Sequence, residues 1–474
     1  MLKPYLSHII FKTISEVIEE TNQSAFVVGG FVRDIFLERP SKDIDVVTLG
    51  SGIDFARKVA NKLNVKKVSV FKNFGTAMFV YKEWEVEFVG ARKESYQRNS
   101  RKPIIENGTL QDDQNRRDFT INAMAIDLSK QNFGQLLDPF NGMQDIQNKR
   151  IVTPLEPHIT FSDDPLRMLR AIRFSTQLNF QIDPKTLLAI KKQAKRIEIV
   201  SQERVVDELN KIILSPRPSV GFKLLFNTNL LQFIFPEMAK LSGVEKINGR
   251  GHKDNFLHTI EVLDNISETS DNLWLRWAAI LHDIGKPKTK RYNQKVGWTF
   301  HSHEVVGSKM VPNIFKNMRL PLNDKMKYVR KLVFLHLRPI ILASDIVTDS
   351  AVRRLLFEAG NDIEDLMLLA EADITSKNEH KVKLFLNNFQ IVRKKLVEIE
   401  EKDHIRNWQP PINGEEIINI FALKPSKIIG ELKDAVKEAI LDGKIKNDRV
   451  EAYHFLVELA REKGVSVKNP LLKE

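Results

Sequence analysis

Two aspartates, Asp43 and Asp45, have a spacing that suits phosphate chemistry. They lie in the run KDIDVV, and residues two apart on a β-strand project from the same face. Adjacent carboxylates repel unless a cation neutralises them, so the pair suggests a Mg²⁺ site that activates a hydroxyl group and steadies a triphosphate. The alternative is a solvated strand end. A third carboxylate is expected from a neighbouring strand, where Glu87 is the candidate and Glu85 shares its face.

A glycine pair precedes these aspartates, at the end of the apolar run SAFVV. Gly29 and Gly30 stand where a predicted strand turns into a helix, and glycine there lets backbone N–H groups approach a phosphate. Arg33 follows on the first helical turn and can pair with a phosphate through two hydrogen bonds. Most Gly-Gly turns only change the direction of the chain, so the phosphate interpretation depends on the aspartates.

The run SDDPLRMLRAIRF contains a second set of charged residues with a chemical use. A carboxylate only accepts hydrogen bonds and a guanidinium only donates them, so Asp164 and Arg167 together match the amino group and ring nitrogen of cytosine or adenine. Uracil and guanine would turn a carbonyl oxygen towards the carboxylate. Arg170 is placed to reach the same nucleotide. The alternative is an ordinary helix start, with Ser162 or an aspartate as N-cap and Pro165 in the first turn.

Six of the 11 histidines fall between residues 252 and 336. Imidazoles and carboxylates from several helices can converge on a divalent ion and leave positions open for water and phosphate. The sequence LHDIGKP contributes a His–Asp pair to this region, and Lys286 follows it either as a phosphate contact or as a solvated lysine. A single His–Asp step is usually structural, but the whole series is not well explained in that way.

The composition argues against a disulfide-bonded or membrane-spanning protein and favours one that binds a polyanion. A chain of 474 residues with no cysteine has neither disulfides nor cysteine-bound metals, and its net charge of +12 favours a polyanionic partner. No uninterrupted apolar run is long enough to span a membrane, and the N-terminus lacks the features of a signal peptide. We therefore expect a cytoplasmic protein without membrane contact.

Periodicity divides the chain into an α/β head, a mixed sheet with helices, and an all-helical body from about residue 155. Strands are expected in the head, and breaks containing proline suggest boundaries in the body. The expected domains are a head (1–150), a helical neck with nucleotide- and RNA-binding motifs (151–240), a metal-binding domain (241–405) and a small helical tail (406–474). The expected strands are 24–28, 43–50, 65–70, 76–81, 86–92 and TINAMAIDL at 120–128.

Three motifs in order resemble one family. GGFVRD followed by KDIDVV resembles the head signature of tRNA nucleotidyltransferases and bacterial poly(A) polymerases, and RRDFTINAMA resembles their next motif. The resemblance implies that Arg117 contacts the nucleotide and that Asp118 takes part in ribose recognition. SDDPLRMLRAIRF resembles the family's Glu-Asp-x-x-Arg motif, with Asp163 where Glu is typical. SQERVVDEL resembles the motif after it, which we interpret as a capping box with ion-paired residues that support the base-reading helix.

The histidine series resembles the metal site of HD domains, which follow the head in many bacterial members of the family. LHDIGKP is close to the HDIG signature, and some HD domains bind a second metal ion. The metal is expected to be a transition metal or Mg²⁺. The residues that the resemblance assigns to the metal site are His258, His282, Asp283, His303, His336 and Asp373.

The resemblance implies an enzyme that adds C, C and A to the tRNA 3′ end from CTP and ATP and releases pyrophosphate. A poly(A) polymerase and a partial enzyme that adds only CC or only A are the nearest alternatives. Two further alternatives are an HD metallophosphohydrolase with an RNA-binding head and a non-catalytic HD domain that positions tRNA or a second subunit.

Overall fold

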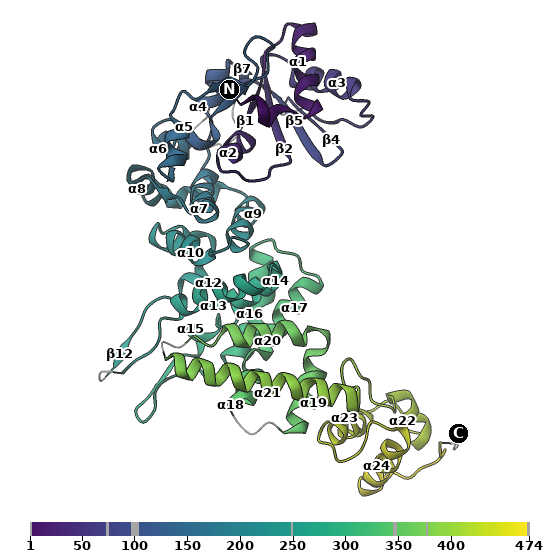
Figure 1. The fold of residues 1–474 in the computed structure, drawn as a ribbon. Coiled ribbons are helices and arrows are strands. Elements are labelled where there is room, and N and C mark those ends of the chain that lie inside the picture. Colours follow the sequence, from purple (N-terminus) through teal and green to yellow (C-terminus); the bar gives the residue numbers. More distant parts are fainter. Residues whose placement is uncertain are drawn as a thin grey trace. The chain divides into compact units, whose positions relative to one another are not determined.

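The chain forms two compact units, Met1–Ala239 and Lys240–Glu474 (Figure 1). The computed structural model describes residues 2–72, 75–95, 104–247, 250–344, 348–375 and 378–471. We describe each unit by itself.

A seven-stranded mixed sheet forms the centre of the first unit. Strand β2 pairs antiparallel with β1 and parallel with β5, so it lies in the middle of the sheet. The strands in spatial order are β3 (Ser69–Phe71), β4 (Thr76–Tyr81), β5 (Trp84–Gly90), β2 (Asp43–Thr48), β1 (Ala25–Val28), β8 (Ala125–Asp127) and β9 (Leu136–Leu137).

The two faces of this sheet differ. Helix α3 (Gly52–Lys62) packs on β4 and β5, and Phe55, Phe79 and Phe88 form a buried aromatic contact there. The other face carries a smaller apolar cluster that includes Val47 and Leu110. Beyond that cluster the alternation of β2 places acidic side chains in solvent. The fold thus leaves the ends of two central strands open on one face.

Short elements and a helical neck complete the first unit. The elements around the sheet are α1 (Ile9–Thr21), α2 (Gly30–Phe36), β6 (Arg92–Ser95), β7 (Ile104–Asn107), α4 (Leu110–Asn115), the 3₁₀ helix η3 (Thr120–Asn122), α5 (Gly142–Gln147), β10 (Arg150–Ile151) and β11 (Gln181–Ile182). The neck helices are α6 (Pro157–Asp163), α7 (Leu166–Leu178), α8 (Pro184–Gln193), α9 (Gln202–Ile213), α10 (Pro218–Asn227), α11 (Leu230–Ile234) and α12 (Pro236–Ala239).

The second unit is mainly helical, with the long helix α21 running alongside α18 and α19 (Figure 1). Its apolar core includes Trp277 and Phe315, both fully buried. The helices are α13 (Asn255–Thr269), α14 (Leu273–Leu281), α15 (Lys286–Thr289), α16 (His303–Asn317), α17 (Asp324–Leu335), α18 (Leu337–Ser344), α19 (Asp349–Ala359), α20 (Ile363–Ala372), α21 (Glu379–Asp403), α22 (Gly414–Phe421), α23 (Lys427–Leu441) and α24 (Arg449–Glu462).

The predicted α/β head followed by a helical body is confirmed, with three corrections. Only Ser69 and Val70 of the strand predicted at 65–70 lie in a strand, β3. The run TINAMAIDL is a strand only in its second half, because Thr120–Asn122 form the 3₁₀ helix η3. The body is not entirely helical, because it contains two antiparallel hairpins. These hairpins are β12 (Lys246–Ile247) with β13 (Arg250–Gly251), and β14 (Arg291–Asn293) with β15 (Gly297–Thr299). No helix in the described ranges is long and apolar enough to cross a bilayer.

Candidate functional site

Strand register brings the acidic residues of the head together. In the parallel pair of β2 and β5, Asp43 lies opposite Glu85 and Asp45 lies opposite Glu87. Neighbouring strands are about 4.8 Å apart, and paired residues project from the same face. The four carboxylates therefore form one acidic patch at the open end of the sheet.

Burial, and after it repulsion between neighbours, raises the pKa of two of these carboxylates. Desolvation by the surrounding protein raises the pKa of Asp45 although its side chain still reaches solvent; Arg117 opposes this rise and Asp43 reinforces it. Desolvation also raises the pKa of Glu87, and repulsion from Asp45 and Glu85 adds to the rise. A divalent cation would relieve this repulsion, so the residues present fit a metal site.

Gly29 stands at the turn from β1 into α2, against the acidic patch. Its φ of +75° lies in the left-handed region that favours glycine. A Cβ atom at this position would lie 3.0 Å from Asp45 Oδ2 and 3.2 Å from an Arg117 guanidinium nitrogen. Gly30 follows with ordinary space around it, its nearest neighbour being an Arg33 nitrogen 3.5 Å away. Carboxylate, guanidinium and backbone therefore converge at the predicted phosphate turn.

A fully buried carboxylate, Asp113 on α4, fixes Arg117 in this position. Asp113 Oδ2 accepts from Arg117 Nε at 3.0 Å, and Asp113 Oδ1 accepts from Arg116 Nε, also at 3.0 Å. The side chain of Asp113 is 0% exposed. Burial by itself raises the pKa of Asp113, but the two guanidinium groups outweigh that effect and lower it. Asp113 therefore stays ionised and holds both arginines.

Arg33 is already engaged in a network rather than free for a phosphate. Its guanidinium donates to both carboxylate oxygens of Asp34 at 2.9 Å and to Asn122 Oδ1 at 2.9 Å. It also lies over the ring of Phe174, 5.1 Å from the centroid. The predicted phosphate contact would require Arg33 to exchange these partners.

Asp118 is the centre of that network. Its Oδ1 accepts from the Phe119 backbone N–H at 2.8 Å and from Asn122 Nδ2 at 3.0 Å, while its Oδ2 accepts from Arg170 Nε at 2.7 Å. Burial by itself raises the pKa of Asp118, but Arg170 and the hydrogen bonds lower it to about 2. The structure thus places Asp118 and Arg170 in one ion pair between the head and the neck.

The predicted pair of Asp164 and Arg167 is not in side-chain contact. Asp164 has an extended backbone before α7, so helical i, i+3 spacing does not apply to it. Its carboxylate accepts from the Leu166 N–H at 3.1 Å and from Arg204 at 3.3 Å. Arg167 is buried and donates to the Thr160 carbonyl at 3.3 Å and to the Arg116 carbonyl. Base reading by both residues would require them to reorient.

The helix-start interpretation of these motifs also needs correction. Pro165 is the N-cap of α7 and Ser162 lies in α6, so Ser162 does not cap α7. Ser201 begins α9 without a side-chain cap bond, so SQERVVDEL contains no capping box. Its ion pairs do occur, because the buried Glu208 accepts from Arg173 at 3.1 Å. Burial, which outweighs this pair, lowers the pKa of Arg173 to about 10.

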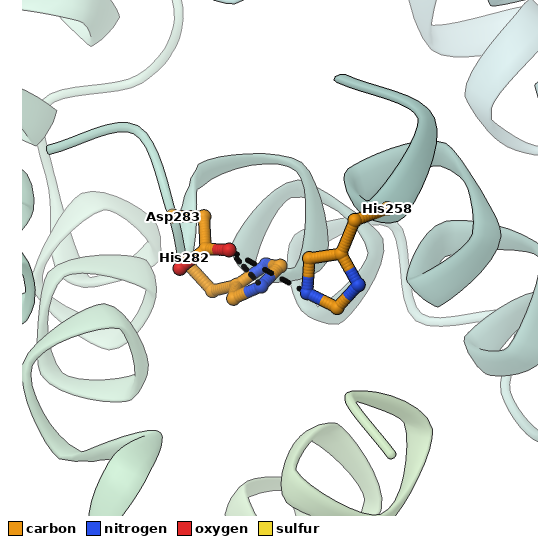
Figure 2. A group of neighbouring side chains, drawn as sticks. All are labelled: His258, His282 and Asp283. Carbon is orange, nitrogen blue, oxygen red and sulfur yellow. Dashed lines mark ion pairs between the residues drawn. The ribbon is translucent and has the colours of Figure 1, made fainter. Parts of the chain in front are cut away.

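The second unit gathers the predicted metal ligands from five helix ends and turns. Figure 2 shows His258, His282 and Asp283 facing one another, with Asp283 Oδ2 3.5 Å from His258 Nε2 and 3.2 Å from His282 Nε2. Asp373 Oδ1 lies 2.8 Å from His258 Nε2. The second carboxylate oxygen of Asp283, Oδ1, lies 3.2 Å from His303 Nε2.

These residues form two groups that share Asp283. Ligand atoms of His258, His282 and Asp283 lie within 4.8 Å of one another, and so do those of Asp283, His303 and His336. A shared carboxylate between two ligand sets is the arrangement that bridges a pair of metal ions. The structure therefore brings all six predicted HD residues together.

Hydrogen bonds hold three of the imidazoles ready for ligation. Nδ1 of His282, His303 and His336 each lies 2.7–2.8 Å from the backbone carbonyl three residues earlier. An Nδ1–H donated there leaves Nε2 with its lone pair, as metal-bound histidines require. His282 Nε2 is buried and has no hydrogen-bond partner within the described structure. A metal ion is the partner that this atom and the flanking carboxylates fit.

Electrostatics around the centre favour a cation. Burial lowers the pKa of His282, but Asp283 and Asp373 more than offset this and raise it to about 9. Burial lowers the pKa of His336 to about 4, and its neighbour His282 contributes to the decrease. Two lysines supply positive charge at the edge: Lys286 Nζ lies 2.5 Å from Asp283 Oδ2, and Lys253 Nζ lies 3.3 Å from His258 Nδ1.

Sequence reasoning missed several residues that organise these sites. Asp113 and Asn122 hold the arginines of the head, Arg204 holds Asp164, and Lys253 approaches the HD centre. One of them had a local signal, because Asp113 precedes Arg117 by four residues, the spacing of a helical ion pair. Asn122 and Arg204 lie far from their partners in sequence, and Lys253 lies five residues before His258, outside the i, i+3 and i, i+4 spacings of a helical pair.

Family models match three consecutive parts of the chain. Residues 25–152 match the poly(A) polymerase head domain, and residues 255–378 match the HD domain. Residues 179–241 match a model described as the probable RNA and SrmB-binding site of polymerase A.

Two curated relatives extend this match. The A-adding tRNA nucleotidyltransferase of Deinococcus radiodurans is 31% identical over 362 residues, which cover 74% of this chain and 80% of that protein. The CCA-adding enzyme of Staphylococcus epidermidis is 37% identical over 234 residues, which cover 48% of this chain and 56% of that protein. The match therefore spans most of the first relative and about half the length of the second.

A solved structure shows the same fold. The CCA-adding enzyme of Bacillus stearothermophilus, solved in complex with CTP, aligns with a TM-score of 0.69 at 22% identity, covering 97% of this chain and 99% of that chain. The mixed sheet with its acidic patch and phosphate turn is a nucleotidyltransferase head. The chain belongs to the family of tRNA nucleotidyltransferases and poly(A) polymerases, in the branch that carries an HD domain. The predicted family resemblance is confirmed.

Proposed function

We propose that this enzyme completes the 3′ end of tRNA by adding C, C and A from CTP and ATP. The convergence of Asp45, Gly29 and Arg117 at one turn carries the proposal, because nucleotidyl transfer needs carboxylates, a close backbone and a cationic group around one triphosphate. The two curated relatives named above, which add A or CCA, and the net charge of +12 support a tRNA substrate.

Asp43, Asp45 and Glu87 would hold Mg²⁺ at the open end of the sheet. The ions supply activation of the tRNA 3′ hydroxyl and neutralisation of the departing pyrophosphate. Arg117, fixed by Asp113, would bind the triphosphate, and the backbone at Gly29 would let it approach. The carboxylates and the guanidinium thus hold opposite ends of the reacting group.

Base choice would come from Asp164 and Arg167 after they exchange their present partners. Arg167 now donates to two backbone carbonyls, and Asp164 pairs with Arg204. A cytosine or adenine edge offers a donor to Asp164 and an acceptor to Arg167, so it can replace both sets of bonds. In the same register, uracil and guanine would turn a carbonyl oxygen towards Asp164 and a ring N–H towards Arg167, so neither hydrogen bond would form, which supports selection of C and A by protein alone. Asp118 and Arg170 would support the ribose side of the same nucleotide.

Addition of A alone is the second candidate, because the Deinococcus relative is named for that activity and matches most of the chain. Purified protein is incubated with three tRNAs, ending at the discriminator base, at the first C and at the second C, and with each labelled nucleotide. CCA addition predicts CTP incorporation on the first two and ATP on the third. ATP incorporation only on the third tRNA would establish the A-adding activity, and long A tracts would establish a poly(A) polymerase.

For the HD centre we propose metal-dependent hydrolysis of phosphoesters. The preset imidazoles, the shared Asp283 and the buried His282 Nε2, which lies 3.2 Å from that carboxylate, support metal binding. Lys253 and Lys286 add cationic groups that can meet a phosphate at its edge. Release of phosphate from a phosphomonoester by the metal-loaded protein, lost in a His282→Ala variant, tests this activity. Retention of the hydrolysis in that variant would overturn it.

A further inference from the structure

Four aromatic rings gather beside the HD centre on the second hairpin and the loop before α13. Tyr292 and Trp298 are cross-strand partners of β14 and β15 with ring centroids 5.2 Å apart. His252 stands edge-on to Trp298 at 5.5 Å and to Phe300 at 5.6 Å. All four rings are partly exposed. We call this group, His252, Tyr292, Trp298 and Phe300, the hairpin platform.

Two lysines approach the faces of these rings. Lys290 Nζ lies 4.6 Å from the centroid of Trp298 and also pairs with Glu245 at 2.9 Å. Lys286 Nζ lies 5.7 Å from the centroid of Phe300. Mutual packing of the rings accounts for a stable hairpin, but it does not require ammonium groups over their faces. Rings combined with cations are the combination that binds a base and its phosphate.

The platform is joined directly to the metal ligands. Lys286, which lies over Phe300, also contacts Asp283 Oδ2 at 2.5 Å. The backbone carbonyl of Phe300 lies 2.8 Å from His303 Nδ1 and accepts its proton, so the platform orients one of the ligands. On the other side, Lys253 follows His252 in the chain and reaches His258 Nδ1 at 3.3 Å. The hairpin platform therefore borders the HD centre through both side chains and backbone.

We propose that the hairpin platform binds the nucleobase of a phosphoester whose phosphate lies at the HD centre. Such a ligand contacts the protein through its base as well as its phosphate, so a phosphoester without a base should bind more weakly. Lys286 lies between ring and carboxylate, where it would contact the phosphate of such a ligand. This inference rests on the proposed phosphohydrolase function of the same centre.

Binding to the Mn²⁺-loaded full-length protein tests the inference by calorimetry. The probes are adenosine 3′-monophosphate, which carries a base, and ribose 5-phosphate, which does not. Base stacking on an aromatic side chain changes affinity by about tenfold or more, so we expect the adenosine probe to bind at least that much more tightly. The His282→Ala variant, in which the metal site is broken, should lose this binding and thereby assign it to the HD centre.

Substitutions at Trp298 separate stacking from packing. Trp298→Leu keeps an apolar side chain but removes the ring. We expect this variant to lower the affinity for adenosine 3′-monophosphate about tenfold and to leave the affinity for ribose 5-phosphate unchanged. Trp298→Phe restores a ring and should recover most of the loss. Trp274→Leu is the matched control, because Trp274 is a half-buried tryptophan of the same unit at the opposite end of α14 from His282.

The outcomes distinguish base binding by the hairpin platform from phosphoester hydrolysis at the HD centre. Equal affinity for both probes, or an affinity for adenosine 3′-monophosphate that Trp298→Leu leaves unchanged, would overturn base binding by the platform but not the phosphohydrolase proposal. Absence of binding by either probe would overturn the phosphohydrolase proposal itself. A lower affinity for both probes in Trp298→Leu would show that the ring only supports the structure of the metal centre. That result would also overturn base binding by the platform.

Discussion

The head site and the HD centre both depend on charged side chains, but they differ in how those side chains are held before any ligand binds. In the head, Asp43, Asp45 and Glu87 reach solvent, and the arginines around them already have protein partners. In the HD centre, His282 and Asp283 are buried and their atoms already face one another. The proposed addition of both C and A requires a site that accepts two nucleotides and a growing RNA end, and exchangeable partners suit that task. A site that holds a metal benefits from ligands fixed in advance.

The largest expected effect separates the two sites completely. Asp43→Ala combined with Asp45→Ala removes the carboxylates proposed to hold Mg²⁺, so nucleotide addition should fall by about 10³-fold or more. Metal bound to the HD centre should stay unchanged, as elemental analysis of the same sample will show. Residual addition near the native rate would refute the assignment of these aspartates.

The converse variant is His282→Ala, which removes a buried ligand from the preset centre. We expect loss of the tightly bound metal, measured by elemental analysis after dialysis, with nucleotide addition retained. His301→Ala is the control, since His301 is an exposed histidine next to the centre. Unchanged metal content in His282→Ala, or equal loss in both variants, would argue against the site.

Asp113→Asn tests whether nucleotide addition depends on a buried carboxylate that positions two arginines. The amide keeps the shape but loses the charge that holds Arg116 and Arg117, so kcat/KM for the nucleotide should fall about 10- to 100-fold. A raised KM for the triphosphate, per folded enzyme, separates this positioning role from a general loss of stability. Asp112→Asn, at the neighbouring carboxylate, which is partly exposed, should retain native kinetics. If both variants behave alike, Asp113 does not position Arg117.

The smallest effects concern fidelity. Asp164→Ala should raise misincorporation of UTP and GTP about tenfold, more than it lowers total incorporation, because one bidentate base contact discriminates by about 1–3 kcal/mol. Arg204→Ala should change misincorporation only a few-fold, since its pair with Asp164 is partly exposed and such pairs contribute about 0.2–1 kcal/mol. Single-nucleotide incorporation assays measure both. Unchanged misincorporation in Asp164→Ala would show that another group reads the base.

The sequence allowed much of the head to be predicted because its information is local. Alternation along a strand places Asp43 with Asp45, and a Gly-Gly step marks the turn beside them. The position of Asp164 was also readable but was missed: the residue before a proline is disfavoured in the α region, and Asp164 precedes Pro165. The four-part domain division and the roles of the site residues stay predictions.

Other features depend on tertiary packing, which local sequence patterns do not reveal. Helical spacing gives both Asp112 and Asp113 an arginine four residues later, so it does not show that only Asp113 is buried against two arginines while Asp112 belongs to a capping box. The hairpins of the second unit have strands of two or three residues, too short to show a period of two. Both kinds of feature come from tertiary packing.

The ion pairs that Arg170 shares between Asp118 and Glu208 have a consequence for how such a protein can diverge. One guanidinium compensates a buried carboxylate that precedes the neck helices and another on helix α9. Neutralising Arg170 or either carboxylate leaves a buried partner less well compensated. Substitutions at these positions should therefore appear in the family as correlated changes rather than singly.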